Sequence, residues 1–357
     1  MAGPPGGGAG MIAAQLDAYR APLRIGAVAE PDCAMDGVIV EVLACGICRS
    51  DWHVWTGADP DVHLPHIPGH EFCGVIVEVG KDVCDWRVGD RVIAPFILAC
   101  GACASCQSGA QTICDSQVLP GFTVNGAFAE RVAVAHADAN LTALPDDMDP
   151  SLAAALGCRV TTAWHALTGR AALQPGEWLG IWGGGGVGLA ALMLGRAMGA
   201  RVAVADVVPE KLEQARALGA EAVIDARDAK AADAMKEATG GGVYLAIEAL
   251  GIEATTANAL ACLRKLGRMV QVGMPAGAQT RMTLPWDAVY SGQLAIYGTR
   301  GMPAHRYPSL LSFIRATGLD LSPMIARRVP LSRVSIELAL FDHPAPPGVA
   351  VITDMTC

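Results

Sequence analysis

The most informative stretch of this chain for its fold is Trp178-Leu-Gly-Ile-Trp-Gly-Gly-Gly-Gly-Val-Gly188. Its apolar first half, Trp178–Trp182, has the length and character of a buried strand, and an apolar helix is expected from Val187 to Met198. Between them, glycines at positions 183, 185 and 188 follow the spacing G-x-G-x-x-G. In a strand–loop–helix unit this spacing permits a tight turn and lets the backbone approach a pyrophosphate. A lone match is weak, because an ordinary tight turn can carry the same pattern.

The sequence after this loop supplies the context that a dinucleotide site requires. A second strand is predicted at Arg201–Ala205, and Asp206 follows it 18 positions after Gly188. An acidic residue at this point accepts hydrogen bonds from the hydroxyls of the adenosine ribose and repels a 2′-phosphate. Phosphate groups would lie at the N-terminus of the helix. The stretch therefore predicts a site for a nicotinamide dinucleotide, with NAD preferred over NADP.

Strands and helices continue to alternate downstream of the loop. A helix with Pro209 in its first turn ends near Gly219, and short strand-like runs follow it. The runs are Ala222–Asp225, Tyr244–Ile247 and Arg268–Val272. Alternation of this kind predicts right-handed βαβ units, and therefore a doubly wound parallel sheet.

The N-terminal half has a different pattern. Turn-separated runs of alternating or β-branched residues predict a mostly β unit, with strands within Gly37–Leu43, Gly74–Val79, Val88–Ile93 and Ala127–Val134. After Leu294 the alternation of helices and strands is lost, and the last strand-like run is Val349–Thr353. We therefore expect a flexible leader at 1–10, a mostly β unit at 11–159, a dinucleotide-binding unit at 160–294 and a C-terminal segment at 295–357.

The composition excludes several classes of protein. The 357 residues are 52% hydrophobic and 17% charged, which excludes a disordered polymer. With 26 Lys and Arg against 35 Asp and Glu, the formal net charge is −9, and this acidic balance disfavours nucleic acid or an anionic membrane as the main partner. The uncharged stretch Trp178–Gly195 is nearly long enough to span a bilayer, but four consecutive glycines in its middle would break such a helix.

The first ten residues, MAGPPGGGAG, lack the basic start and the continuous apolar core of a secretory signal. We therefore expect the chain to work in the reducing cytoplasm. In that compartment the 12 cysteines should not form disulfides.

A cluster of four cysteines has the spacing C-x2-C-x2-C-x7-C: Cys100, Cys103, Cys106 and Cys114. Four thiolates on one short loop suit a closed, tetrahedral zinc site. A ferredoxin-type iron–sulfur site begins with the same spacing but continues with x3 and places a proline after the fourth cysteine, whereas Asp115 follows here. Four buried cysteines without a metal are the other alternative. The spacing favours structural zinc.

Three further segments carry metal-ligand residue types, although each alone could be a core cysteine, a surface histidine or a solvated glutamate. They are Cys45-Gly-Ile-Cys-Arg-Ser-Asp-Trp-His53, Gly69-His-Glu71 and Gly157-Cys-Arg159. Together with the cysteine cluster and the glycine loop, they resemble the zinc-dependent medium-chain alcohol dehydrogenases from Met11 to the C-terminus. The resemblance implies a GroES-like catalytic domain that the C-terminal segment completes, and an inserted Rossmann domain that binds NAD.

The resemblance also implies a catalytic zinc. Its protein ligands would be Cys48, His70 and Cys158, with an open fourth position for water or a substrate oxygen. Asp51 would hold His70 in its tautomer and orientation. Glu71 would lie behind the zinc and act as an alternative ligand during water exchange.

Other positions implied by the resemblance would move the proton and bind the coenzyme. Ser50 would pass the alcohol proton toward the coenzyme ribose and then to His53, which would release it to solvent. The implied contacts with the dinucleotide come from Arg49 at the pyrophosphate, Thr162 near the nicotinamide, Asp206 and Lys211 at the adenosine ribose, and Gly183, Gly185, Gly186, Val187 and Gly188 in the loop.

The resemblance thus predicts an NAD-dependent alcohol dehydrogenase with two zinc ions per chain, acting as a homotetramer or homodimer on a small-molecule alcohol or aldehyde. The alternatives are a polyol or amino-alcohol dehydrogenase of the same superfamily and a non-catalytic, NAD-sensing protein that retains the fold. Cys158 as the third ligand favours the alcohol dehydrogenase type. Phe96 matches a substrate-pocket position, and we place Trp52 and Trp55 near the pocket mouth, which favours an apolar substrate.

Overall fold

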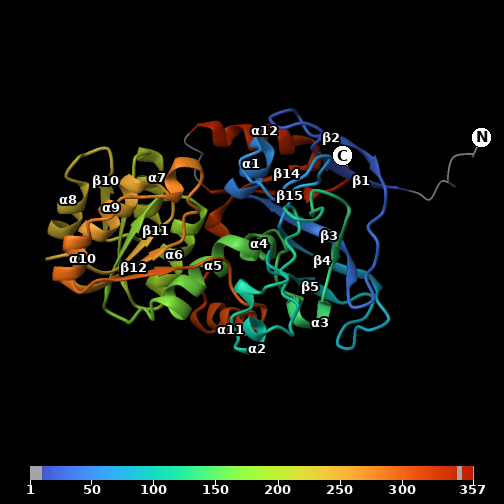
Figure 1. Ribbon diagram of the computed structural model, residues 1–357, viewed down its shortest axis with the longest axis horizontal. Coiled ribbons are helices and arrows are strands. Elements are labelled where there is room, and N and C mark those ends of the chain that lie inside the picture. Colours follow the sequence, from blue (N-terminus) through green and yellow to red (C-terminus); the bar gives the residue numbers. More distant parts are fainter. Residues whose placement is uncertain (1–9, 344–347, 357) are drawn as a thin grey trace, which may run out of the picture.

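The computed structural model describes residues 10–343 and 348–356, and it contains two sheet-based units that lie side by side (Figure 1). The leader expected at residues 1–10 lies outside the described residues, apart from Gly10.

The first unit is built around a seven-stranded sheet with β3 (Val38–Ile47) at its centre. β3 pairs antiparallel with β4, β6 and β15, and β15 pairs parallel with β14. The blue and red ribbons of Figure 1 therefore meet, because the end of the chain returns to its beginning. The remaining strands of this sheet are β4 (Glu71–Val79), β5 (Arg91–Ile93), β6 (Arg131–Val134), β7 (Thr142–Ala143), β14 (Ile325–Pro330) and β15 (Val349–Asp354), and the separate antiparallel pair is β1 (Met11–Gln15) and β2 (Arg24–Val28).

The second unit contains a six-stranded sheet in which all the neighbouring strands are parallel, in the order β10-β9-β8-β11-β12-β13. The doubly wound prediction is therefore confirmed. β8 lies where the strand order changes direction, which is where open parallel sheets bind ligands. The strands are β8 (Trp178–Trp182), β9 (Arg201–Asp206), β10 (Ala222–Asp225), β11 (Val243–Glu248), β12 (Leu263–Gln271) and β13 (Ala295–Gly298), and the helices between them are α6 (Gly186–Ala197), α7 (Pro209–Ala217), α8 (Ala231–Ala238), α9 (Glu253–Ala261) and α10 (Trp286–Gly292).

Short helices surround the first sheet and join the two units. α4 packs against β3 and β4, and it leads through the π-helical turn η2 (Leu156–Val160) into α5, which contacts α6 of the second unit. One buried apolar cluster contains residues of both units, for example Ile93, Leu179 and Val351. The two sheets therefore share part of one core. The helices of this group are α1 (Arg49–Thr56), α2 (Ala104–Gln107), α3 (Ala137–Asn140), α4 (Pro150–Ala155), α5 (Thr161–Trp164), α11 (Tyr307–Thr317) and α12 (Val334–Ala339).

Several observed elements begin or end at other residues than expected, and two of these cases show why. β13 pairs with β12, so the parallel sheet continues to Gly298, four residues beyond the expected end of the second unit at 294. Within Ala127–Val134 only Arg131–Val134 forms a strand beside β3, while Ala129 makes an isolated bridge to Ala13. In both cases a partner strand far away in the sequence sets the boundary.

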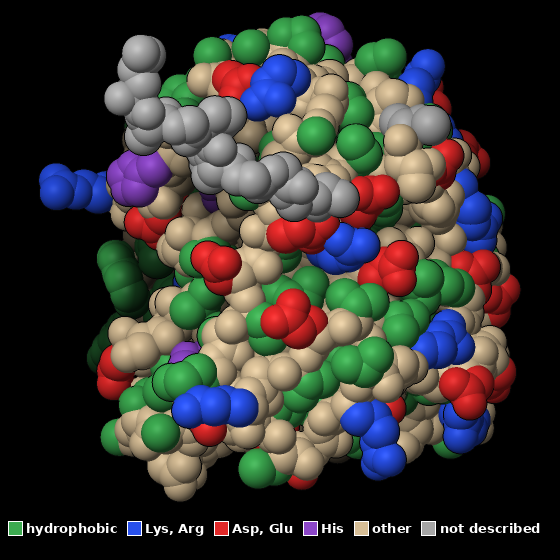
Figure 2. All heavy atoms as spheres, turned by 90° about the vertical axis from the view of Figure 1, so that its right-hand side faces the viewer, with side chains coloured by type: hydrophobic (Ala, Val, Ile, Leu, Met, Phe, Trp, Pro, Cys, Tyr) green, Lys and Arg blue, Asp and Glu red, His purple; other side chains and the backbone are tan. Residues whose placement is uncertain are grey.

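The surface agrees with a chain of mixed charge. On the end of the first unit, acidic and basic side chains are interspersed (Figure 2). Among the residues that the structure describes, no helix is both long enough and apolar enough to cross a membrane.

Candidate metal and dinucleotide sites

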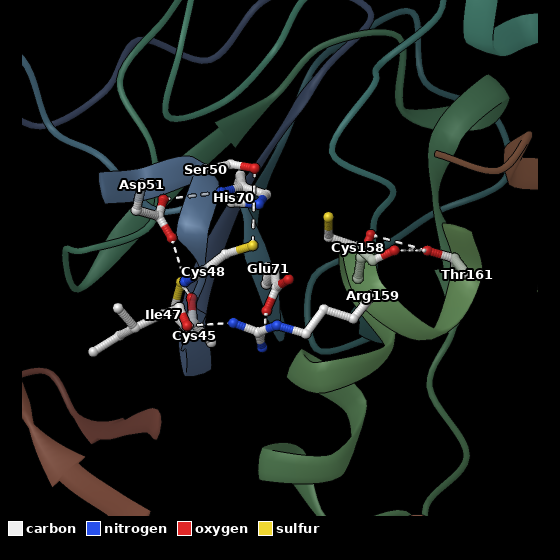
Figure 3. A network of polar contacts seen from close by, with 12 residues as sticks. Cys45, Ile47, Cys48, Ser50, Asp51, His70, Glu71, Cys158, Arg159 and Thr161 are labelled. Atoms are coloured by element: carbon white, nitrogen blue, oxygen red, sulfur yellow. Dashed lines mark hydrogen bonds and ion pairs between the residues drawn. The ribbon is translucent and has the colours of Figure 1, made fainter. Parts of the chain in front are cut away.

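The first expected metal ligand lies where β3 ends and α1 begins. Cys48 is the N-cap of α1, and its backbone N–H donates to Oδ2 of Asp51, 2.7 Å away. This contact satisfies one of the N–H groups that a helix leaves free at its start. It also fixes the turn on which Cys48, Ser50 and Asp51 are carried, so that the helix start places all three side chains at the site (Figure 3).

Asp51 orients His70 as expected for a histidine that binds a metal. Its Oδ1 lies 2.9 Å from Nδ1 of His70 and accepts the Gly69 N–H at 3.1 Å, and both side chains are fully buried. Gly69 has a φ of +102°, and a Cβ there would lie 2.6 Å from the Phe128 nitrogen, so that only glycine suits this turn. With Nδ1 engaged, Nε2 of His70 is buried without a hydrogen-bond partner among the described residues. A metal ion would satisfy it.

Cys158 completes the group from the second side of the site. It lies in η2, which contacts β4 of the first unit and α6 of the second, and Figure 3 shows it across the site from Cys48 and His70. The ligand atoms of Cys48, His70, Glu71 and Cys158 all lie within 4.8 Å of one another. A hydrogen bond from Cys158 and the charge of Arg159 lower the pKa of the Cys48 thiol well below its usual value. Two cysteine sulfurs, one imidazole and a nearby carboxylate are donors that zinc accepts.

Arg159 is one of two residues at this site to which the sequence analysis gave no role; the other is Phe122. It is 5% exposed, and its Nη1 donates to Oε2 of Glu71 at 2.7 Å. Burial raises the pKa of the Glu71 carboxyl, while the charge of the Arg159 guanidinium lowers it and favours the carboxylate. The available signal was a lone arginine inside the otherwise uncharged stretch Leu156–His165.

The two residues expected to carry the proton both lie on α1. Ser50 Oγ is 3.9 Å from the Cys48 sulfur, so that its hydroxyl borders the group of metal ligands. His53 is half-buried one turn further along, and its Nδ1 has no partner among the described residues. Burial, together with the charge of Arg49, lowers the pKa of His53. A neutral imidazole at this position can accept a proton from the site.

Aromatic rings cover the imidazole of His70. Phe96 meets it edge-on at 5.8 Å between ring centroids, and Phe122, which the sequence analysis missed, lies at 5.0 Å. Trp52 is half-buried beside His53, whereas Trp55 is 7% exposed and packs in the core, with its indole N–H donating to the Ala21 carbonyl oxygen. The expectation that Trp55 lies near a pocket mouth was therefore wrong. Its place on the inner face of α1 commits it to the core.

The second cysteine cluster forms a compact group of four sulfurs. Cys103 lies 3.5 Å from Cys106 and 3.9 Å from Cys114, and all four sulfurs are within 4.8 Å of one another. α2 begins directly after Cys103, and backbone N–H groups near its thiol lower the pKa of Cys103 to about 6. A thiol that ionises readily is a better metal ligand. The geometry fits a tetrahedral ion held by Cys100, Cys103, Cys106 and Cys114.

The other five cysteines among the described residues belong to neither group of candidate metal ligands. All 11 described cysteines are free thiols. Burial raises the pKa of Cys73 and of Cys262 to about 12, which keeps both in the neutral form, whereas Cys84 is exposed. Cys357, also expected to be a free thiol, lies outside the described residues.

The glycine loop has the geometry that its spacing predicts. Gly183 follows β8 with a φ of +105°, and Gly185 is the N-cap of α6. A Cβ at Gly188 would overlap the Gly183 carbonyl oxygen, so that the helix packs closely on the strand only because position 188 is glycine. Gly186 and Val187 form the first turn of α6. The backbone N–H groups of this turn are available for phosphate oxygens.

The residues expected around the dinucleotide lie in different environments. Asp206 ends β9, is 4% exposed, and has Lys211 Nζ at 3.9 Å from its Oδ2. Thr162 is buried, and its Oγ1 has no partner among the described residues. Arg49 donates to the Phe341 carbonyl oxygen and stacks over the Trp52 ring at 4.2 Å. In this arrangement the Arg49 guanidinium lies against the C-terminal segment.

Comparison with known proteins gives consistent matches along the chain. Residues 34–146 match the family described as alcohol dehydrogenase GroES-like domain, and residues 186–316 match the zinc-binding dehydrogenase family. An alcohol dehydrogenase of Geobacillus stearothermophilus is 39% identical over 296 residues, which cover 81% of this chain and 86% of that protein. An L-threonine 3-dehydrogenase of Streptomyces coelicolor is 33% identical over 334 residues, or 92% and 95% of the two chains. The solved structure of an alcohol dehydrogenase from Thermus sp. ATN1 superposes with a TM-score of 0.88 at 28% identity, over 96% and 100% of the two chains.

Proposed function

The chain belongs to the zinc-dependent medium-chain alcohol dehydrogenase family, and we propose that it oxidises an apolar alcohol to the aldehyde or ketone at a zinc site formed by Cys48, His70 and Cys158. It is a nicotinamide-dinucleotide-dependent oxidoreductase that acts on CH–OH groups and binds zinc. The substrate and the residue roles below are our proposals. The observation that carries them is the convergence of three donor atoms around the unpartnered Nε2 of His70.

The donor set fits a catalytic zinc with an open position. Cys48, His70 and Cys158 come from three segments of the chain, and Glu71 stands behind them. Zinc bound there would act as a Lewis acid and favour the deprotonated form of a substrate alcohol. Asp51 would hold His70 with Nε2 facing the ion. Phe96 and Phe122 would give the substrate an apolar wall.

We assign the proton path to Ser50 and His53. Ser50 would accept the proton of the alcohol hydroxyl while passing its own proton on, because a serine hydroxyl both donates and accepts. His53 would receive it at a ring nitrogen and release it to solvent, since its lowered pKa keeps the ring neutral between turnovers. Its place on α1, three residues after Ser50, supports this assignment.

We propose NAD as the coenzyme in preference to NADP. Asp206 lies at the end of β9, where the adenosine ribose would be expected, and it would repel a 2′-phosphate. Gly183, Gly185, Gly186, Val187 and Gly188 would receive the pyrophosphate at the start of α6. Thr162 would pack near the nicotinamide, and Arg49 would need to leave Phe341 to reach the pyrophosphate.

We further propose a second zinc ion, held by the loop of Cys100, Cys103, Cys106 and Cys114, with a structural role. We propose the domain limits 11–159 and about 160–294, with β13 adding residues up to Gly298 to the parallel sheet of the second domain. We propose the reducing cytoplasm as the compartment, because six of the 11 described cysteines lie in two groups suited to binding metal. A homo-oligomer, tetramer or dimer, is proposed from the resemblance, and light scattering of the purified protein would measure it.

The function is tested by following NADH formation with a panel of aliphatic, aromatic, polyol, amino-alcohol and hydroxy-acid substrates. We expect apolar primary or secondary alcohols to give the highest kcat/KM. L-Threonine or a polyol as the best substrate would instead favour the amino-alcohol or polyol alternative, toward which the Streptomyces relative points. Binding of NADH without turnover of any substrate by zinc-loaded protein would contradict the proposal and favour an NAD-sensing protein.

A further inference from the structure

Arg159 is a buried, charged residue to which the proposed reaction assigns no role. It follows Cys158 in η2, and only 5% of its surface is exposed. An arginine is rarely buried unless its guanidinium is paired and hydrogen-bonded, because the loss of hydration is costly. The contacts of this side chain therefore indicate what it does.

Those contacts join the three segments that carry the metal ligands. Nη1 donates to Oε2 of Glu71 at 2.7 Å, and Nη2 donates to the Ile47 carbonyl oxygen. Glu71 is the neighbour of His70 in the sequence, Ile47 is the neighbour of Cys48, and Arg159 itself is the neighbour of Cys158. One guanidinium thus connects the residue adjacent to each ligand, as the dashed lines of Figure 3 show.

The stem of Arg159 also passes over the start of the glycine loop helix. A Cβ at Gly186 would overlap Cδ of Arg159 and would lie 2.7 Å from its Nε. Glycine at position 186 therefore leaves the space that the arginine stem occupies. This is a requirement for Gly186 that comes from the metal site and is independent of a bound dinucleotide.

Glu71 has little freedom apart from this pair. On one side a Cβ at Gly46, its partner in the β3–β4 ladder, would overlap Oε2, and on the other a Cβ at Gly157 would lie 3.1 Å from the Glu71 Cα. The second oxygen, Oε1, is buried and has no hydrogen-bond partner among the described residues. One carboxylate oxygen lies within 4.8 Å of the donor atoms of Cys48, His70 and Cys158. Among the described residues, Arg159 is thus the one side chain that donates a hydrogen bond to this carboxylate, which lies beside the other candidate ligand atoms.

We propose that Arg159 is a positioning residue that holds Glu71 away from the open coordination position of the catalytic metal. The inference rests on the proposed metal site. Without the guanidinium, both oxygens of a buried carboxylate would lack a partner, and the nearest cation would be the metal. A Glu71 oxygen would then bind the metal as a fourth protein ligand and displace the water or substrate oxygen. The site would change from an open to a closed one.

The test uses the protein with cobalt in place of the catalytic zinc, because the visible spectrum of cobalt reports its ligands. Four variants are compared with the wild type: Arg159→Met, Arg159→Lys, Glu71→Gln and the double variant with Arg159→Met and Glu71→Gln. We expect Arg159→Met to shift the cobalt spectrum and to lower alcohol oxidation about 10–100-fold. The double variant should regain most of the wild-type spectrum, because glutamine is a much weaker metal ligand than glutamate. Arg159→Lys, which keeps the charge but has one ammonium for two acceptors, should shift the spectrum partly.

Several outcomes would overturn the proposal. One is a cobalt spectrum of Arg159→Met that equals the wild-type spectrum. If Arg159→Met does not fold, an unchanged spectrum of Arg159→Lys has the same meaning. Another is a shift in Arg159→Met that persists in the double variant, because the disturbance would then come through Ile47 and the Cys48 backbone and not through Glu71. These results leave the proposed function intact if the wild type oxidises alcohols. A wild-type protein that binds no cobalt at Cys48, His70 and Cys158 would instead contradict the proposed metal site itself.

Discussion

Asp206 lies at the end of β9 with both carboxylate oxygens occupied by backbone. Oδ2 accepts the Gly184 N–H at 2.7 Å and Oδ1 accepts the Val208 N–H at 2.9 Å, so that the side chain is fixed before any ligand arrives. Like charges in contact across an interface cost several kcal/mol. We therefore expect kcat/KM for NADP to be at least about tenfold lower than for NAD, since tenfold corresponds to about 1.4 kcal/mol.

Asp206→Asn removes the charge and gives up one of the two backbone hydrogen bonds; because NAD and NADP are compared on the same variant, this loss affects both coenzymes alike. In this variant the values of kcat/KM for NAD and NADP should lie closer together than in the wild type. Lys211 should contribute to this change, because its ammonium group would still attract the 2′-phosphate. Steady-state kinetics with both coenzymes measure this. Equal kcat/KM values for the wild type would mean that Asp206 does not face the ribose.

Ser50 borders the proposed metal ligands, and the one side-chain contact of its hydroxyl among the described residues is a long one, 3.9 Å from Oγ to the Cys48 sulfur. Ser50→Ala should lower kcat by about 10²–10⁴-fold, the usual range for loss of a proton-transfer group. Zinc content and NADH affinity should stay near the wild-type values. Ser50→Thr, which keeps the hydroxyl, is the control, and His53→Ala should lose less activity and regain part of it with small buffer bases. Wild-type turnover in Ser50→Ala would require another route for the proton.

The protonation of His165 should make the free energy of unfolding depend on pH. Burial and the positive charges of Arg306, Arg170 and His305 lower its pKa to about 4, and Nη1 of Arg306 lies 3.3 Å from its Nδ1. An unfolded histidine has a pKa near 6.5, so the unfolded chain binds a proton first as the pH falls. The free energy of unfolding should therefore decrease between about pH 6.5 and pH 4.

His165→Gln, which cannot be protonated, should make this decrease shallower. Urea unfolding at several pH values measures it, with His63→Gln on the exposed surface as the control for losing a histidine. If His165→Gln and the wild type had parallel pH profiles, the titration of His165 would not contribute.

The two cysteine-containing sites differ as structural elements. Cys48, His70 and Cys158 are brought together by β3, β4 and η2, which the apolar core already holds. The loop that contains α2 has only a small apolar cluster, which consists of Ala99 and the four cysteines. The zinc proposed for this loop would therefore supply much of its order, since zinc binding contributes roughly 10–16 kcal/mol in small zinc-finger peptides.

Substitutions in the two sites should therefore have different effects on activity and on thermal stability. Cys48→Ala should leave a folded protein that binds NADH and is inactive, whereas Cys106→Ala should lower the soluble yield and the melting temperature. Metal content and melting temperature are measured together for both variants. A Cys106→Ala protein with two zinc ions per chain and a wild-type melting temperature would contradict the structural role.

Elements whose signals are local could be predicted from the sequence. β8, the glycine loop and α6 follow one another directly, and Cys100 to Cys114 lie on one loop, so spacing alone describes them. Arg159 could not be predicted in this way, because its partners Glu71 and Ile47 are 88 and 112 residues away in the sequence. The limits of β13 and β6 were missed for the same reason, since partner strands determine them.

On the scale of the whole molecule, the last strand closes the first sheet and joins it to the second. β15 lies between β14 and β3, and Val351, which is fully buried, pairs with Gly46 and Arg328. Val351 belongs to the same apolar cluster as Leu179 and Ile181 of β8. Because the two sheets share this core, we expect them to unfold together as one cooperative unit.

Val351→Asp tests this cooperativity by placing an unpaired carboxylate in the shared core, which should cost roughly 3 kcal/mol or more. Hydrogen exchange followed by mass spectrometry should show protection falling by a similar factor in β3 and in β8, although the substitution lies in neither strand. Thr353→Asp introduces the same charge at an exposed position two residues further along β15 and should leave both unchanged. Loss of protection in β3 with full protection in β8 would mean that the dinucleotide-binding sheet is stable on its own and that the shared cluster does not couple the units.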